Sequence, residues 1–277
     1  MTRGGSPVFS LLKYLTLVLG VFAAVIPITV VLFTSLKTPE ENARNSALMA
    51  PENWLNFVNY KRAIVEGHMM TGFMNTLIIL VISLTGAIIL GTMIAYILDR
   101  FNFRGKKIIL NLFILAVLIP GVTTQVAIFQ IINNLGLFNT RASAIVLYLG
   151  TDIIAVYIFL QFLKTISTEL DESAMLDGAS YFTIFFKIIL PLLKPAIATV
   201  VIIKGVGIYN DFYIPFLYMP KEGLNVVSTA LYKFKGPYVS QWEVICAAII
   251  VCIIPTLIAF LSLQKHIYNG FTQGSVK

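Results

Sequence analysis

The chain has 277 residues, of which 58% are hydrophobic and 12% are charged, and its formal net charge is +7. Soluble domains carry about 25% charged residues, so a charge depletion that extends over the whole length excludes an ordinary soluble protein and predicts a polytopic membrane protein. The positive charge does not indicate nucleic-acid binding, because the basic residues are spread over short segments between apolar runs and form no single patch.

Six apolar runs are each long enough to cross, as a helix, a bilayer core about 30 Å thick. In chain order they are 15–33, 73–98, 108–132, 142–163, 195–217 and 244–263. Backbone polar groups must be paired in lipid, and the alternation typical of a membrane barrel is absent, so we expect every run to be helical. The sequence predicts an all-α membrane protein with one transmembrane domain over residues 1–277.

The first run follows Arg3 and Lys13, as the core of a signal peptide would. It is longer than a usual signal core and no small-residue cleavage pattern follows it, so we interpret it as a retained signal-anchor helix. Six spans place both termini on one side. The short segment 99–107 is rich in Lys and Arg, and the positive-inside rule therefore predicts cytoplasmic N- and C-termini. Residues 35–72 then form the first outer loop, and residues 264–277 form a cytoplasmic tail.

The segment 164–195, between the fourth and fifth runs, is expected in the cytoplasm. Thr168 with Asp171 three residues later is a helix-start pattern, and carboxylates in a first helical turn suit the helix dipole. Gly178 is a natural helix stop, and Ser180 is suited to cap a second helix.

The second helix is apolar, and Pro191 and Pro195 should break or kink the chain before the fifth span. Local physics thus predicts two short exposed helices joined by a glycine. An ordinary interfacial loop is an equally good interpretation at this level.

A longer motif favours a specialised role for this segment. Glu172-Ser173-Ala174 is followed after three residues by Gly178, and after nine more by Ile188-Ile189-Leu190-Pro191. This stretch resembles the conserved loop of ABC importer permeases, which has the pattern E-A-A, three residues, G, nine residues, I-x-L-P. The spacings match in full, and the departure is Ser173, a small residue that still allows close helix packing.

Three other segments resemble the sugar-importing branch of that family. They are 177–180 with 190–195, the sequence Tyr209-Asn210-Asp211-Phe212, and the C-terminal stretch 270–277. The likeness covers most of the chain and is strongest to the smaller membrane subunit of maltose-type importers. The resemblance implies a six-helix importer permease fold that forms half of a translocation channel.

The resemblance also implies partners. A coupling helix carrying Glu172, Ser173, Ala174, Asp177 and Gly178, with Pro191 beyond it, would dock in a cleft of a separate ATPase subunit. The tail, at Thr272, Gly274 and Lys277, would also reach the ATPase. The assembly would also contain two ATPase subunits, a second homologous permease that forms a heterodimer with this chain, and an extracellular or periplasmic sugar-binding protein. It would lie in a bacterial plasma membrane, in contact with lipid, and no nucleic-acid partner is expected. The chain has no G-x-x-x-x-G-K-[ST] phosphate loop, so ATP and Mg²⁺ would be used by the partner, and no cofactor is expected here.

The resemblance leaves the cargo open. A di- or oligosaccharide is the first prediction, with an α-galactoside such as raffinose as one candidate. A polyol phosphate or another polar solute is the alternative.

Two charges lie near the middle of predicted spans, Asp152 in the fourth and Lys204 in the fifth. Intramembrane charges are costly and are therefore functional candidates. The two side chains are expected to approach each other or to share a polar cavity. Three interpretations remain open: a pair that fixes helix packing, a role in the substrate path, or side chains that extend toward the membrane surface (snorkelling). Asp211, seven residues after Lys204, would line the outer channel with Tyr209 and Asn210, or form a packing cluster at the helix end.

Other classes of protein fit less well. A polytopic membrane enzyme should show clustered catalytic groups at a membrane face, and none is present. His68 and His266 are isolated, and no metal-ligand spacing occurs. A secondary transporter would normally show inverted repeats, and we detect no such symmetry.

Overall fold

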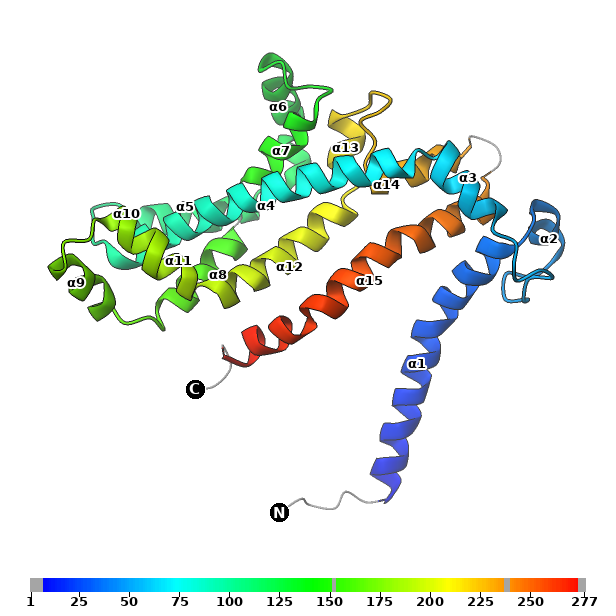
Figure 1. Ribbon diagram of the computed structural model, residues 1–277, viewed down its shortest axis with the longest axis horizontal. Helices are drawn as coiled ribbons and strands as arrows, with labels where there is room; N and C mark the ends of the chain where they lie inside the picture. Colours follow the sequence, from blue (N-terminus) through cyan, green and yellow to red (C-terminus); the bar gives the residue numbers. More distant parts are fainter. Residues whose placement is uncertain (1–6, 151–152, 237–239, 274–277) are drawn as a thin grey trace. The chain divides into compact units, whose positions relative to one another are not determined.

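The computed structural model describes residues 7–150, 153–236 and 240–273 of the chain. Every regular element among these residues is a helix, which confirms the predicted all-α class (Figure 1). The first eight are α1 (Pro7–Leu36), α2 (Pro39–Arg44), α3 (Val58–Glu66), α4 (Met69–Arg100), α5 (Lys106–Leu118), α6 (Gly121–Asn134), α7 (Arg141–Leu149) and α8 (Ile153–Leu163). The rest are α9 (Glu169–Leu176), α10 (Tyr181–Ile184), the π-helix η1 (Phe185–Ile189), α11 (Leu190–Leu192), α12 (Lys194–Asn210), α13 (Tyr213–Tyr218), α14 (Val227–Ala230), the 3₁₀-helix η2 (Leu231–Phe234) and α15 (Trp242–Gln273).

Within the described part of the chain, three helices are long and apolar enough to cross a membrane without a break. They run over Phe9–Leu36, Met69–Arg100 and Trp242–Ser262. Three further pairs of helices meet the same criterion only together, and the total reaches six if each bent pair is one span. The helices are therefore compatible with the predicted six spans, but half of these spans are bent.

The bends of the third and fourth spans were not predicted, whereas the bend before the fifth span falls between Pro191 and Pro195, where the sequence predicts a break or kink. The third run bends by 102° between α5 and α6, where Pro120 lacks an N–H to continue the helix. The fourth bends by 44° between α7 and α8, after Gly150. The fifth bends by 72° between α11 and α12, and α12 ends at Asn210 instead of continuing to residue 217.

The described residues form two compact units. The smaller unit comprises the chain up to Met69 together with Ala230–Ile258, and the larger comprises Met70–Thr229 with the chain from Ala259 onward. In the smaller unit the predicted outer loop is folded. Thr38 and Glu41 form a reciprocal capping box at the start of α2. The backbone amides of Thr38 and Glu52 donate to the Glu41 carboxylate and hold its pKa below the usual value.

Two hydrophobic clusters organise the larger unit. One gathers the C-terminal end of α4 with α8 and the segment α9–α12, around Phe159, Ile184 and Leu193. The other gathers the first half of α4 with α6, α7 and the end of α12, around Ile79, Tyr148 and Tyr218. The predicted coupling segment is therefore packed against the C-terminal end of α4, where α9 and α10 lie in Figure 1.

Candidate functional site

The first helix of the predicted coupling segment, residues 164–195, is the acidic helix α9, whose two ends form in different ways. The side chain of Thr168 makes no capping hydrogen bond, contrary to expectation, because Thr168 itself has helical backbone angles. The hydroxyl of Ser167 accepts from the Glu169 amide instead, at 3.2 Å.

At the other end the glycine stop is confirmed. Gly178 has φ +81°, and the amides of Gly178 and Ala179 donate to the carbonyls of Met175 and Ala174. These bonds close the helix as a Schellman motif, which favours glycine at this position.

The second half of the segment turns the chain toward α12. The Ser180 side chain accepts from the Thr183 amide, so the predicted cap is confirmed. The following residues pass through the π-helix η1 and the short α11, which holds Pro191 at its start. Pro195 occupies the first turn of α12, and the 72° bend falls between α11 and α12. The prolines therefore flank a sharp change of direction, as expected, and the bend joins the coupling segment to the fifth span.

A buried ion pair fastens α9 to the end of α4. The Arg100 Nε atom lies 3.1 Å from the Asp171 Oδ2 atom, and both side chains are only 8% exposed. The Tyr96 hydroxyl donates to the other carboxylate oxygen of Asp171 at 2.8 Å. Arg100 also pairs with Asp99 and donates to the carbonyl of Ile166 at 2.9 Å. One guanidinium group thus holds the last turn of α4, the entry to α9 and the first turn of α9.

The sequence did not reveal this pairing. Arg100 contributed only to the count of basic residues, and Asp171 only to a helix-start pattern. The available signal was weak: a basic residue ends a long apolar helix, and a carboxylate precedes the Glu172 motif. Partners 71 positions apart in the chain become visible as a pair only when α4 and α9 lie side by side.

The motif residues of α9 face two ways. Ala174 is buried in the cluster around Phe159, whereas Glu172, Ser173, Asp177 and Gly178 are exposed. Pro191 is exposed as well. The side chain of Leu176 is 90% exposed at the tip of the helix, although it is apolar. No pattern in the sequence singled out Leu176. Leu170 and Met175 of the same helix are also exposed, so apolar and acidic side chains share the surface of α9.

Of the predicted tail residues, Thr272 lies in the last turn of α15, and Gly274 and Lys277 fall outside the described residues.

The proposed intramembrane pair is located in part. Asp152 falls outside the described residues. The Lys204 ammonium group donates to the carbonyl of Gly150 at 2.6 Å, at the break between α7 and α8. The basic group of α12 is therefore directed at the segment that contains Asp152, but a contact between the two side chains stays a prediction.

Asp211 joins three elements at the C-terminal end of α12. Its carboxylate accepts from the Tyr148 hydroxyl at 2.8 Å and from the amides of Tyr213 and Ile214. The Ser228 hydroxyl donates to its carbonyl. Asp211 therefore ends α12 and starts α13. The neighbouring Asn210 is exposed and donates to the Val206 carbonyl one turn earlier, while Tyr209 is half-buried.

Comparison with known proteins identifies the family. Residues 87–273 match the family described as "Binding-protein-dependent transport system inner membrane component". The chain belongs to this family. It is thus a permease component of a binding-protein-dependent ABC importer and not an enzyme, and it resides in the inner membrane. Such a system implies a binding protein and an ATPase as separate partners.

Individual relatives agree over nearly the whole length. The chain is 33% identical to "Probable starch degradation products transport system permease protein AmyC" of Thermoanaerobacterium thermosulfurigenes, covering 96% of this chain and 97% of that one. It is 31% identical to "Melibiose/raffinose/stachyose import permease protein MelC" of Bacillus subtilis (strain 168), with the same coverage. Its fold matches a bacterial ABC transporter involved in alginate import with a TM-score of 0.82 at 20% identity, over 96% of this chain and 98% of the other.

Breaking the Arg100–Asp171 pair should destabilise the protein strongly. Arg100→Met leaves a buried carboxylate without its cation, and we expect a loss of about 3–5 kcal/mol. The double variant Arg100→Met with Asp171→Leu removes both charges and should recover most of that loss. Thermal unfolding of the purified protein measures the effect, and trypsin cleavage near Lys164 and Lys187 reports release of the segment.

The matched control is Arg62→Met. Arg62 pairs with Glu66 at 3.2 Å and donates to the Gln241 side chain at 2.6 Å; both partners are accessible to water, and such an ion pair contributes under about 1 kcal/mol. If the double variant were as unstable as the sum of its two single variants, the pair would not be acting as a unit.

Proposed function

We propose that this chain is the permease subunit of an ATP-driven importer for a di- or oligosaccharide and forms half of the translocation channel. One observation supports the coupling mechanism most directly. An acidic helix, α9, presents Glu172, Leu176 and Asp177 on its exposed face and is fastened to α4 behind. A second observation supports the cargo, because the relatives AmyC and MelC carry names of starch-product and of melibiose, raffinose and stachyose transport.

The proposed assembly pairs this chain with a second homologous permease, two ATPase subunits and a sugar-binding protein outside the membrane. ATP and Mg²⁺ are used by the ATPases. Residues 1–277 form one permease domain with cytoplasmic termini, an outer loop at 35–72, a coupling loop at 164–195 and a tail at 264–277. The basic segment after α4 supports this orientation, because Arg104, Lys106 and Lys107 follow the end of a membrane helix.

In the proposed mechanism, closure of the ATPases moves α9, and two connections carry the motion into the membrane. The Arg100–Asp171 pair connects α9 with α4, and the run α10–η1–α11 leads into α12 across the 72° bend. Ile184 and Ile189 of this run are fully buried in the hydrophobic cluster. Because close-packed interiors have low compressibility, a displacement of α9 is passed on to α12.

The transport prediction is direct. The chain should be purified with its partner permease, ATPase and binding protein, and reconstituted in liposomes. We expect uptake of an oligosaccharide of the α-galactoside or starch-product type that requires ATP and Mg²⁺, and stimulation of ATPase activity by the sugar-loaded binding protein. A prior ligand screen on the binding protein separates sugars from polyol phosphates. Uptake driven by a proton gradient without ATP would contradict the proposal.

The exposed leucine provides a test of the coupling contact. We expect Leu176→Ala to weaken association with the ATPase by about 30-fold, because truncating a central interface residue costs about 2 kcal/mol. Copurification of the ATPase at graded concentrations measures the change. Leu170→Ala is the matched control, since Leu170 is on another face of the same helix and is less exposed. Equal weakening by both variants would show that α9 does not dock through its Leu176 face.

The substrate path is proposed to include Tyr209, Asn210 and Asp211 at its outer part, with Lys204 and Asp152 deeper. Asn210 is the member with an exposed polar side chain, and Asp211 holds the end of α12 in place.

We expect Asn210→Ala to slow sugar uptake by up to about ten-fold, because one hydrogen bond contributes up to about 1.5 kcal/mol, without lowering thermal stability. Tyr148→Phe is the control for a purely structural effect at this cluster. It removes the hydroxyl that binds Asp211 and should lower stability by about 1 kcal/mol. If uptake and ATPase stimulation by the Asn210 variant stayed unchanged, the cluster would be structural only.

A further inference from the structure

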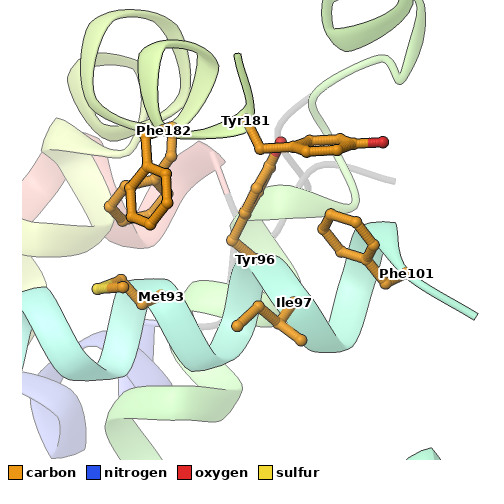
Figure 2. Close-up of a pocket in the computed structure, with 7 residues that line it drawn as sticks. Met93, Tyr96, Ile97, Phe101, Tyr181 and Phe182 are labelled. Carbon is orange, nitrogen blue, oxygen red and sulfur yellow. The ribbon is translucent and has the colours of Figure 1, made fainter. Parts of the chain in front are cut away.

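An apolar pocket opens beside the ion pair, at the C-terminal end of α4. It has a cavity volume of about 140 Å³ and is lined by Met93, Tyr96, Ile97, Phe101, Tyr181, Phe182 and Phe185. Figure 2 shows the Tyr181 ring beside the hydroxyl end of Tyr96 and above the Phe101 ring, with the Tyr181 hydroxyl directed away from Met93 and Ile97. The Tyr96 hydroxyl is engaged by Asp171. The pocket therefore offers no polar group for a sugar, and it suits a hydrocarbon ligand.

The walls of the pocket come from a predicted membrane span and from the coupling loop. Ile97 and Met93 lie in the apolar run 73–98, one and two turns before Arg100, which ends α4. Tyr181, Phe182 and Phe185 belong to the coupling loop, so the pocket lies where the span meets this loop. The acyl chains of membrane lipids surround an apolar helix of this kind and reach the wall of the pocket that α4 forms. Phe182 and Ile97 are 69% and 45% exposed, so the pocket is open at its rim.

The rim of the pocket is basic. Phe101, which forms one wall, is followed by Arg104, Lys106 and Lys107, and the Lys106 ammonium group donates to the Phe101 carbonyl at 3.4 Å. The nearby carboxylate of Asp99 is paired with Arg100. Arg104 and Lys107 are exposed beyond it. Positive charge at the polar end of an apolar slot between membrane helices matches a phosphate headgroup above an acyl chain.

We propose that this pocket binds one acyl chain of an anionic phospholipid, whose phosphate is held by the basic segment 104–107, in the leaflet on the side of the coupling loop. The volume suits a segment of one chain, since a cavity of about 150 Å³ accommodates a benzene-sized group. The bound chain packs against Tyr96, the residue whose hydroxyl holds Asp171 and thereby α9. The site does not depend on the identity of the cargo.

Photochemical labelling of the assembled importer tests the proposal. The complex is placed in phosphatidylcholine nanodiscs that contain phosphatidylglycerol with a diazirine on its acyl chain, and the labelled residues are mapped by mass spectrometry. We expect labels to concentrate on the pocket residues. Ile97→Trp fills the pocket and should reduce this labelling several-fold. Leu90→Trp is the matched control, two turns earlier on the same helix, equally exposed but outside the pocket, and should leave labelling unchanged.

The headgroup is tested separately. Arg104→Gln and Lys107→Gln should each raise the concentration of phosphatidylglycerol probe needed for half-maximal labelling by about five-fold, the effect expected for one basic residue at an anionic membrane surface. A phosphatidylcholine probe with the same diazirine should respond to neither variant. These changes are on exposed side chains, so a folding defect does not confuse the result.

Three outcomes would overturn the proposal. Labels spread evenly over all lipid-facing residues would indicate bulk lipid only. A pocket that is protected from lipid but crosslinks to the second permease or to the ATPase would indicate a protein occupant. Equal labelling by both headgroup probes, with no effect of Arg104→Gln or Lys107→Gln, would remove the anionic specificity. None of these outcomes bears on ATP-driven sugar uptake, which is measured independently.

Discussion

A single buried ion pair fixes the position of α9, the first helix of the coupling segment, against the end of α4. Arg100 ends α4 and Asp171 lies in the first turn of α9, with a separation of 3.1 Å between charged atoms that water hardly reaches. Leaving one charge buried without the other is costly, so the two helices are held at one relative position. The Tyr96 hydroxyl donates to the other oxygen of the Asp171 carboxylate, and the Arg100 Nη2 group donates to the Ile166 carbonyl. Because the side of α9 that carries Asp171 is fixed against α4, the side that carries Leu176 stays exposed to solvent.

The bends in the helices follow from the same requirement to combine a membrane path with a coupling segment. A straight fifth span could not both cross a bilayer and lie against the end of α4. The chain instead passes through η1 and α11, turns by 72° and continues as α12. Pro195 fits the first turn of α12, where a missing N–H costs little. Pro191 follows the π-helix η1 within the continuous helical run 181–192 and lies just before the bend. The bend links the coupling segment directly to α12.

The far end of α4 is held by a second set of polar contacts. Asn75 donates to the carbonyls of Gly223 and Asn225 and accepts from Arg141 at 2.7 Å. Asp211 joins the end of α12 and the start of α13 to Tyr148, which belongs to the hydrophobic cluster that also contains Ile79 of α4. One long helix thus carries a polar junction at each end, one near the coupling segment and one near the proposed outer part of the substrate path. A displacement at the first junction has a rigid element along which to reach the second.

The sequence by itself determined the class of protein, because charge depletion and apolar run lengths reflect the cost of polar groups in lipid and need no knowledge of contacts. It also determined the Gly178 stop, the Ser180 cap and the coupling motif, since each depends on residues near one another in the chain. The tertiary structure alone decided the pairing of Arg100 with Asp171, the outward position of Leu176 and the attachment of Asp211 to Tyr148. It also decided where the third and fourth spans bend. These features depend on contacts between segments that are far apart in the sequence. A local sequence pattern does not specify which distant residue a charged side chain will contact or how far a helix will bend.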